Sequence, residues 1–223
     1  MIPGDISVVI PAINEEAVVV EAIGSAFDAG ATEVILVDGG STDSTMDIAR
    51  QAGATKIVRS LPGRGIQLNS GALMVDRDFV LFLHADNRLA QDCLQQICEL
   101  DSPTWGAFRQ RIDSSRFIFR LIERGNALRV RLRGIPFGDQ AVFIRKEAFD
   151  RNGRYSEIPL MEDVDFAKRM RKWERPVLLE GPVTINARRW QKHGPIRQTI
   201  RNWRIQLAYR FGVSPQRLVE WYR

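Results

Sequence analysis

Residues 34–43 read VILVDGGSTD, four apolar residues followed by an aspartate, two glycines and a polar stretch. Such a short apolar run predicts a buried strand, and the glycines after it predict a loop that leads into a helix near Asp43. Other apolar runs are followed in the same way by polar residues, at Asn14-Glu15, Asp86 and Glu162-Asp163. In an open α/β sheet such loops meet at the carboxyl ends of the strands. We therefore expect these side chains to line one crevice that suits a divalent metal and a phosphorylated ligand.

The composition is that of an ordinary globular protein, with 44% hydrophobic and 26% charged residues among 223. This length allows one α/β domain. We expect a single domain over residues 1–223, with a helical tail over about 191–223. The chain shows no signal segment and no run of the roughly 18 apolar residues that a spanning helix needs, which predicts a cytoplasmic location.

The net charge of +5 is distributed unevenly. From residue 186 onward, nine basic residues are opposed by one acid. Apolar residues recur there at three- and four-residue intervals, at Ile196, Ile200, Trp203 and Leu207. This pattern predicts a helix over 193–209 that packs its apolar residues on the rest of the protein and turns Arg197, Arg201 and Arg204 outward. Such a helix is either purely structural, or a peripheral contact with the anionic inner face of a membrane or with an anionic acceptor.

Strand and helix signals alternate through the first half of the chain. Short apolar runs predict strands at 6–10, 34–37, 56–59 and 79–83. Helices between continuous apolar strands predict a mainly parallel sheet that is covered on both faces. Later segments, 105–112 and 140–144, alternate in part and predict further strands, with a basic amphipathic helix over 117–133 between them. The predicted fold class is α/β, with a mainly parallel, mixed central sheet flanked by helices and a basic helical extension at the C-terminus.

The loops after the first two strands are candidates for a nucleotide site. Asn14 is typical of a helix N-cap, and the acids after it complement the helix dipole. Asp38 stands at a strand end, where it could accept a hydrogen bond from a base or a ribose. Gly39 and Gly40 would let the backbone approach a ligand closely. The pattern is not G-x-G-x-x-G, which disfavours a nicotinamide cofactor.

Two further acidic loops are candidates for catalysis. Asp86 follows the most apolar strand and can hold a hard cation, whose shell a bound diphosphate would complete. The alternative is a turn-forming Asp-Asn pair with His84 packed beside it. Glu162-Asp163 stands before a helix predicted over 166–173, where acids often serve only as caps. In a crowded acidic crevice, however, repulsion would raise the pKa of one acid toward values useful for proton abstraction.

Together these segments resemble family 2 glycosyltransferases of the GT-A fold, over roughly residues 5 to 190. The resemblance rests on SVVIPAINEE, VDGGSTDST, HAD, MEDVDF and NARRW in this order. The segments GRGIQLNSGA, FGDQAVFIRKEAF and YRFGVSPQRL also resemble a small bacterial subgroup described as transferase 2, which is associated with radical-SAM and selenodomain proteins.

The resemblance implies roles for individual residues. Those implied to bind the nucleotide of a nucleoside diphosphate sugar are Pro11, Ala12, Glu15, Asp38, Gly39, Arg64 and Asp86. Those implied to meet the donor sugar or the acceptor are Gly138, Asp139, Glu162, Arg189 and Trp190. Asp86, with His84 beside it, would hold the Mg²⁺ or Mn²⁺ that bridges the diphosphate. Asp163 would be the general base that takes the proton of the acceptor hydroxyl, in a single displacement that inverts the anomeric centre.

The sequence departs from the family pattern in two places. His84 replaces the first acid of the Asp-x-Asp signature, and a nitrogen ligand could favour Mn²⁺. NARRW replaces the Gln-x-x-Arg-Trp motif of processive synthases, which favours transfer of a single sugar. Two alternatives stay open: a nucleotidyltransferase, which would normally carry a G-x-G-T-R type loop after the first strand, and a non-catalytic binder of nucleotide sugars or nucleic acid. No zinc-finger or RNA-recognition pattern is present, so no nucleic-acid partner is expected.

Overall fold

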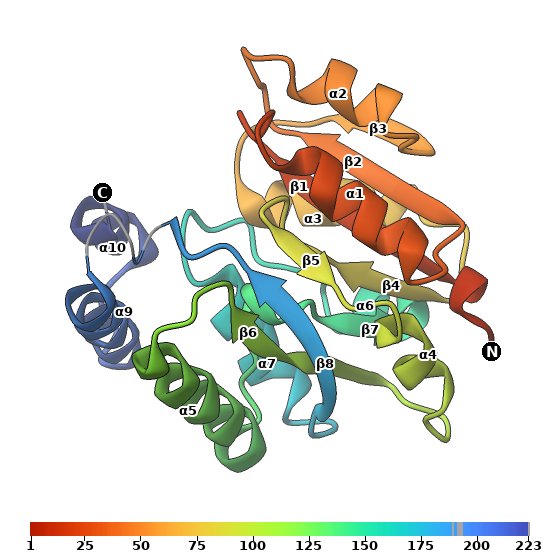
Figure 1. Ribbon diagram of the computed structural model, residues 1–223. Coiled ribbons are helices and arrows are strands. Elements are labelled where there is room, and N and C mark those ends of the chain that lie inside the picture. Colours follow the sequence, from red (N-terminus) through yellow and green to blue (C-terminus); the bar gives the residue numbers. More distant parts are fainter. Residues whose placement is uncertain (189, 191–193, 223) are drawn as a thin grey trace.

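The computed structural model describes residues 1–188, 190 and 194–222, and these contain one eight-stranded sheet in the order β3-β2-β1-β4-β7-β6-β8-β5 (Figure 1). The strands are β1 Ile6–Ala12, β2 Glu33–Asp38, β3 Lys56–Arg59, β4 Phe79–Phe82, β5 Asn87–Leu89, β6 Trp105–Ile112, β7 Phe143–Arg145 and β8 Val177–Ile185. Strands β3, β2, β1 and β4 are parallel. Strand β7 is antiparallel to both of its neighbours, and β5 is antiparallel to β8. The predicted α/β class with a mixed, mostly parallel sheet is confirmed.

Helices cover both faces of this sheet (Figure 1). They are α1 Val19–Asp28, α2 Thr45–Gln51, α3 Arg64–Leu73, α4 Cys93–Cys98, α5 Phe117–Arg133, α6 Lys146–Arg151, α7 Glu162–Met170, α9 Pro195–Arg210 and α10 Pro215–Tyr222, with short 3-10 turns η1 Pro3–Asp5 and η2 Gly138–Gln140. Helices α1 and α4 pack on one face, and α3, α6 and α7 pack on the other. Helices α9 and α10 lie at the side of the molecule away from the N-terminus (Figure 1). No helix within the described ranges is both long and apolar enough to cross a membrane.

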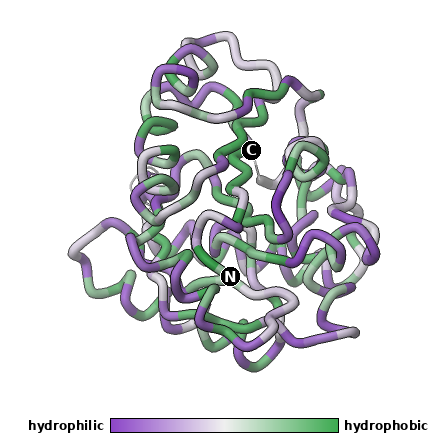
Figure 2. Tube along the Cα trace, turned by 90° about the vertical axis from the view of Figure 1, so that its right-hand side faces the viewer, coloured by the Kyte–Doolittle hydropathy of each residue, from purple (hydrophilic) through white to green (hydrophobic). Residues whose placement is uncertain are grey.

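The packing of strand β1 explains why its residues are apolar at successive positions. Val8 and Ile10 enter the core with α1, whereas Val9 enters the core on the opposite face. Successive side chains of a strand point to opposite faces, so a strand that is covered on both sides must be apolar throughout. In Figure 2, strongly hydrophobic stretches of the trace run through the middle of the molecule, while hydrophilic stretches lie largely around its edge.

Several predicted boundaries are wrong, and local backbone conformations explain some of the differences. The predicted strand 140–144 is shortened to β7 because Ala141 has φ +45, a left-handed conformation that no strand accommodates. Helix α7 begins at Glu162 rather than at residue 166, directly after Met161 with φ +71. Strand β8 was not predicted from the sequence, because its Gly181-Pro182 pair is typical of a loop.

The prediction that Asn14 caps the first helix is also wrong. Helix α1 begins at Val19, and no side chain caps it. Asn14 instead has φ +53, and its Oδ1 accepts a hydrogen bond of 2.8 Å from the backbone N–H of Thr42. Asparagine tolerates this left-handed conformation better than most residues. Asn14 therefore joins the loop after β1 to the loop after β2.

The orientation predicted for the basic C-terminal helix is wrong for its apolar residues, whereas Arg197 and Arg204 are exposed as predicted. Its apolar residues Ile196, Ile200, Trp203 and Leu207 are 50% to 65% exposed. The residues of α9 that are buried are Pro195, Gln198 and Ile205. Helix α9 therefore packs on the protein through the face that carries the Gln198 amide. The apolar residues that recur along the helix face solvent instead. Residues 191–193, where the predicted helix was expected to begin, lie outside the described part of the chain.

Candidate active site

The loop after β2 is shaped by its own aspartate. Asp38 is 1% exposed, and its carboxylate accepts backbone hydrogen bonds of 3.0 Å from Gly40 and 3.1 Å from Ser41. Gly40 has φ +100, which favours glycine. A Cβ on Gly39 would lie 2.6 Å from Ile13, so this glycine is required by packing. In this structure Asp38 and Gly39 therefore form the loop behind the crevice, and their predicted contact with a nucleotide stays a prediction.

Gln67 is a positioning residue that the sequence did not reveal. Its side chain is buried, and Nε2 donates hydrogen bonds of 3.0 Å to the carbonyl of Ala12 and 2.9 Å to that of Val37. One amide from α3 thus ties the ends of β1 and β2 together. A buried amide with both strand ends as partners holds the base of the crevice rigid.

A first pocket, with a volume of about 390 Å³, opens at the carboxyl ends of β1 and β4. It brings together residues that were predicted to bind the nucleotide or the metal, namely Pro11, Ala12, Glu15, Arg64, His84 and Asp86, with Glu162, which was predicted to meet the donor sugar or the acceptor. Val219 of α10 lines the same pocket. These residues come from loops far apart in sequence, as expected for the crevice of an open α/β sheet.

Arg64 and Glu162 form an ion pair inside this pocket. Arg64 is the first residue of α3 rather than part of a turn, and its Nη1 lies 3.1 Å from Glu162 Oε1. Burial raises the pKa of Glu162, while the positive charge of Arg64 opposes this shift. Burial is thus the main cause of the raised pKa of Glu162, and the neighbouring acid Asp163 adds to it. The partner of Glu162 in the ion pair is a residue that was predicted to meet the nucleotide.

Arg188 bridges two acids at the mouth of the pocket. Its Nη2 lies 2.9 Å from Glu15 Oε2 and 3.1 Å from Asp86 Oδ2. A cation at this point neutralises acids that would otherwise repel a diphosphate. Arg188 was not predicted as a site residue, because the sequence shows it only as one of several arginines in a basic segment. The adjacent Arg189, which was predicted to meet donor or acceptor, lies outside the described residues.

The donor set at Asp86 fits a metal ion that arrives with a diphosphate. Among the described residues, no group of three or more His, Cys, Asp and Glu is arranged to hold a metal. Mg²⁺ needs only one or two protein carboxylates where phosphate oxygens and waters supply the other ligands. Asp86 provides one such carboxylate, beside Arg188. A Cβ on Gly138 would lie 2.9 Å from His84 Nε2, so this ring packs against backbone.

A second pocket, of about 150 Å³, adjoins the first. The two share Arg64, His84, Asp86 and Leu160. Asp139, Asp163 and Trp190, all predicted to act on donor or acceptor, line the second pocket. A molecule that spans both pockets therefore extends from the carboxyl end of β1 to the first turn of α7.

Asp163 is held in a fixed orientation. Its Oδ2 accepts a hydrogen bond of 2.8 Å from the backbone N–H of Gly138, and its Oδ1 accepts one of 2.6 Å from Val164. Each carboxylate oxygen has a second lone pair for a further partner. Gly138 thus acts on the site through its backbone, since it positions Asp163.

Asp139 is the most perturbed acid of the second pocket. Burial raises its pKa to about 6, with Arg129 opposing the shift and Asp163 adding to it. Its Oδ1 is buried without a hydrogen-bond partner among the described residues. Burial also lowers the pKa of Arg129 to about 10. The Arg129 guanidinium carbon lies 3.3 Å from the centre of the Phe137 ring, which forms part of the pocket wall.

The far wall of the second pocket comes from the C-terminal part of the chain. Trp190 packs edge-on against Phe119 of α5, with ring centres 6.0 Å apart. Helix α9 contributes Gln198, Asn202 and Gln206 to the lining. Gln198 Nε2 donates a hydrogen bond of 2.9 Å to Asn202 Oδ1. These amides were missed, although their four-residue spacing, which places side chains on one helical face, was a usable signal.

Comparisons with known proteins agree with this geometry. A family model described as Glycosyl transferase family 2 matches residues 7–151. Glycosyltransferase AglJ of Haloferax volcanii is 32% identical over 85 residues, which cover 38% of this chain and 28% of that protein. A PGL/p-HBAD biosynthesis glycosyltransferase of Mycobacterium bovis is 26% identical over 232 aligned positions, which cover 93% of this chain and 86% of that protein.

Solved structures share the fold at low sequence identity. The structure of S. aureus TarS 1-349 has a TM-score of 0.67 at 17% identity, and the match covers 82% of this chain and 60% of that chain. Glucosyl-3-phosphoglycerate synthase from Mycobacterium tuberculosis, in complex with Mg²⁺ and uridine diphosphate, has a TM-score of 0.59 at 19% identity. That match covers 81% of this chain and 69% of the synthase.

These findings favour the glycosyltransferase interpretation of the sequence over the two alternatives, the nucleotidyltransferase and the non-catalytic binder. The family match begins in β1, ends at the last residue of α6 and so includes the loops that carry Asp38 and Asp86. The match covers well over half of the chain, and the structural neighbours are GT-A enzymes. Glycosyltransferase AglJ is matched over 28% of its own length and TarS 1-349 over 60%. The chain belongs to glycosyl transferase family 2 and has the GT-A fold.

Proposed function

We propose that this protein is a glycosyltransferase that moves one sugar from a nucleoside diphosphate sugar to an acceptor hydroxyl, with inversion at the anomeric centre. The observation that carries the proposal is the pair of adjoining pockets that share Arg64, His84 and Asp86. The first pocket is lined by residues from β1 and α3 and would take the nucleotide. The other presents the fixed carboxylate of Asp163, so that donor and acceptor would meet at the shared wall.

In the proposed donor complex, Pro11, Ala12 and Glu15 contact the base and the ribose. Arg64 and Arg188 lie where the negative charge of the diphosphate would be, and both already pair with acids in this structure. A Mg²⁺ or Mn²⁺ ion held by Asp86 would neutralise the charge that develops on the leaving diphosphate. Asp139 and Trp190 would contact the donor sugar or the acceptor from the wall of the second pocket.

Asp163 is proposed to remove the proton of the acceptor hydroxyl. The supporting observation is that two backbone N–H groups orient its carboxylate while the residue lines the second pocket. A base in hydrogen-bond reach of the acceptor allows the oxygen to attack the face of the sugar opposite the diphosphate. One such displacement inverts the configuration and needs no covalent intermediate on the protein.

The remaining parts of the proposal concern organisation and location. We infer one domain over 1–223, in which about 1–100 bind the nucleotide, about 101–190 bind the acceptor and about 191–223 form a helical tail. The segments quoted from the sequence support membership in the radical-SAM and selenodomain-associated subgroup and transfer of a single sugar. The cationic α9 supports a cytoplasmic enzyme in peripheral contact with the inner face of an anionic membrane.

Isothermal calorimetry with a panel of nucleoside diphosphate sugars tests the donor site. At least one member should bind, and binding should strengthen when Mg²⁺ or Mn²⁺ replaces a chelator. Labelled sugar from that donor should then appear in a product with inverted configuration. Failure of every nucleoside diphosphate to bind would contradict the proposal, and a retained configuration would contradict the single displacement.

A further inference from the structure

Helices α5 and α9 lie near each other at one side of the molecule (Figure 1). Between them is an open apolar groove of about 1090 Å³ beside the candidate active site. Its walls carry Leu121, Leu128 and Leu132 from α5 and Ile200, Trp203 and Leu207 from α9. These side chains are between 47% and 68% exposed. Proteins rarely leave so large a contiguous apolar surface in water unless it meets a partner. The groove therefore predicts an apolar ligand.

The charged residues described in the lining of the groove are all positive. Five cations line it, namely Arg129, Arg133, Lys168, Arg171 and Arg210, and no acid is found among the described lining residues. Basic side chains at the edge of an apolar surface can cover it with their stems and keep their charges in water. An occupant that complements this groove has an apolar body and a negative charge.

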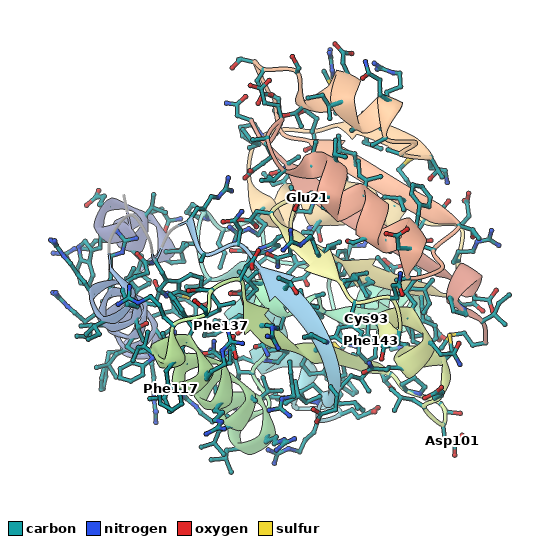
Figure 3. The ribbon with its side chains drawn as sticks, in the orientation of Figure 1. Glu21, Cys93, Asp101, Phe117, Phe137 and Phe143 are labelled. Atoms are coloured by element: carbon teal, nitrogen blue, oxygen red, sulfur yellow. The ribbon has the colours of Figure 1, made fainter. Side chains whose placement is uncertain are left out.

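The groove connects directly to the candidate active site. Phe137, Val164 and Gln206 line both the groove and the second pocket. Val164 is the residue whose backbone N–H binds Asp163. Figure 3 shows the labelled Phe117 at the start of α5 beside α9, and the labelled Phe137 toward the sheet. A chain that lies in the groove can thus place its polar end at Asp163.

The charge of the groove argues against a second copy of this protein as the occupant. A twofold interface would bring the same cationic walls together, and like charges that face each other in an interface are unfavourable. A membrane lipid has the required combination of a flexible apolar chain and a single polar end. Trp203 and its neighbours Arg197 and Arg204 also suit the boundary between lipid and water.

Resting on the proposed transferase function, we propose that the acceptor is an anionic membrane lipid. Its apolar chain lies in the groove between α5 and α9, and its acceptor oxygen reaches Asp163 past Phe137 and Gln206. Helix α9 then has two functional faces. Its apolar residues hold the chain, and the amides Gln198 and Asn202 contact the polar end of the lipid.

Binding of dodecyl phosphate monomers tests the groove without knowledge of the natural head group. The informative variant is Leu121→Glu/Ile200→Glu, which adds a carboxylate to each wall at exposed positions. The matched control is Leu73→Glu, since Leu73 is an exposed residue of α3 outside the groove. The double variant should bind dodecyl phosphate more weakly by about tenfold or more, because it places charge against the apolar chain. The wild type and the control should bind equally.

Three companion measurements separate the competing explanations. Nucleoside diphosphate affinity should be the same in all three proteins, which shows that the donor site is intact. Inorganic phosphate should not displace dodecyl phosphate, which shows that the chain is recognised. Vesicles that contain phosphatidylglycerol should retain the wild type and should release it as salt rises, whereas the double variant should not bind.

Photocrosslinking locates the two ends of the bound chain. A dodecyl phosphate analogue with a diazirine beside the phosphate should label peptides that contain Asp163 or Gln206, and one with a terminal diazirine should label α5 or α9 further along the groove. Equal dodecyl phosphate affinity in all three proteins would overturn the proposal. So would a concentration-dependent dimer that the double variant loses, or head-group labelling away from Asp163. Lipid binding without donor binding would leave the groove as a lipid site but overturn its role in acceptor recognition.

Discussion

Asp163 combines a fixed orientation with a position in the wall of the second pocket. The variant Asp163→Asn keeps the shape of the side chain but cannot accept a proton. We expect turnover to fall by roughly a hundredfold or more while donor affinity stays unchanged. Labelled-sugar transfer and calorimetry measure the two quantities.

A control lies in the same helical turn. Asp165 hydrogen-bonds Ser156 and Arg169, so Asp165→Asn should lower thermal stability but not turnover per folded molecule. If Asp163→Asn behaves like this control, Asp163 serves only to organise the start of α7.

Asp86 is the residue on which the proposed metal dependence rests. Asp86→Ala should remove the difference in nucleoside diphosphate affinity between solutions with Mg²⁺ and with a chelator, because it removes the carboxylate that holds the ion. It should also free Arg188 to bind phosphate, so weak metal-independent affinity should persist. Asp47→Ala, which removes an exposed acid of α2, is the control and should leave both affinities unchanged. A metal effect that survives in Asp86→Ala would contradict the proposed ion site.

Asp139 predicts a pH dependence of stability. Its pKa rises from 3.8 to about 6 because burial favours the neutral carboxyl. The folded protein then holds this proton to higher pH than the unfolded chain, so the contribution of Asp139 to stability falls as pH rises through this window. The variant Asp139→Asn has no carboxyl group at this position, so it does not lose stability in this way as pH rises. Its melting temperature relative to wild type should therefore increase between pH 4 and about 6 in metal-free buffer and level off above. A difference that is constant with pH would contradict the assigned shift.

At the scale of elements, α10 reaches the first pocket through Val219, which lines it, so we expect this helix to contribute to donor binding. Leu218 beside it is fully buried and anchors the helix. A chain that ends at residue 213 should bind nucleoside diphosphate about tenfold more weakly, because one apolar wall of the pocket is lost. The circular dichroism of the sheet should persist. The variant Trp221→Ala, which changes a more exposed residue of α10, is the control. Unchanged affinity in the shortened chain would show that α10 does not close the pocket.

The elements that could be predicted from the sequence are those with a regular hydrophobic pattern along their whole length. Helix α5 was predicted with the correct bounds, because a long amphipathic run has a clear period. Strand β8 was missed, since glycine and proline interrupt it and its partner strands lie far away in the sequence. The same difference applies to the site. Asp86 and Asp163 stand out at the ends of apolar runs, whereas Gln67 acts through carbonyl groups that only the folded chain brings within reach.

Helix α9 shows how a correct helix can be given the wrong orientation. The rule that apolar residues face the core predicted burial of Ile200 and Trp203, yet both are exposed. This rule does not hold for a helix whose amide side chains line a polar pocket and whose apolar side chains form a surface that binds a ligand. The exposed apolar residues of α9 are the basis of the proposed lipid groove, and only the fold shows that they face α5.

At the scale of the whole molecule, the sheet has two parts that meet at the pairing of β4 with β7. Strands β3, β2, β1 and β4 are parallel and come from consecutive segments of the chain. The second set consists of β7, β6, β8 and β5. It contains both parallel and antiparallel pairs, and its spatial order differs from the order in the chain. Most of the proposed donor residues follow the first set of strands, whereas Gly138, Asp163 and Arg188 follow the second. The crevice between the two sets therefore depends on both being formed.

Strand β5 gives this topology a consequence for biosynthesis. It is an edge strand, and its partner β8 leaves the ribosome long after it. Strands β1 to β4 can pair early, and β5 can contact α1, but the segment between β4 and β5, which contains Asp86, joins the sheet at its far end only when β8 arrives. Pulsed hydrogen exchange during refolding should show the amides of β5 and β8 gaining protection together, after those of β1 and β2. Early protection of β5 would contradict this order. A nascent chain would then complete its nucleotide-binding layer first, and would gain the ability to hold a donor only as one of its last folding events.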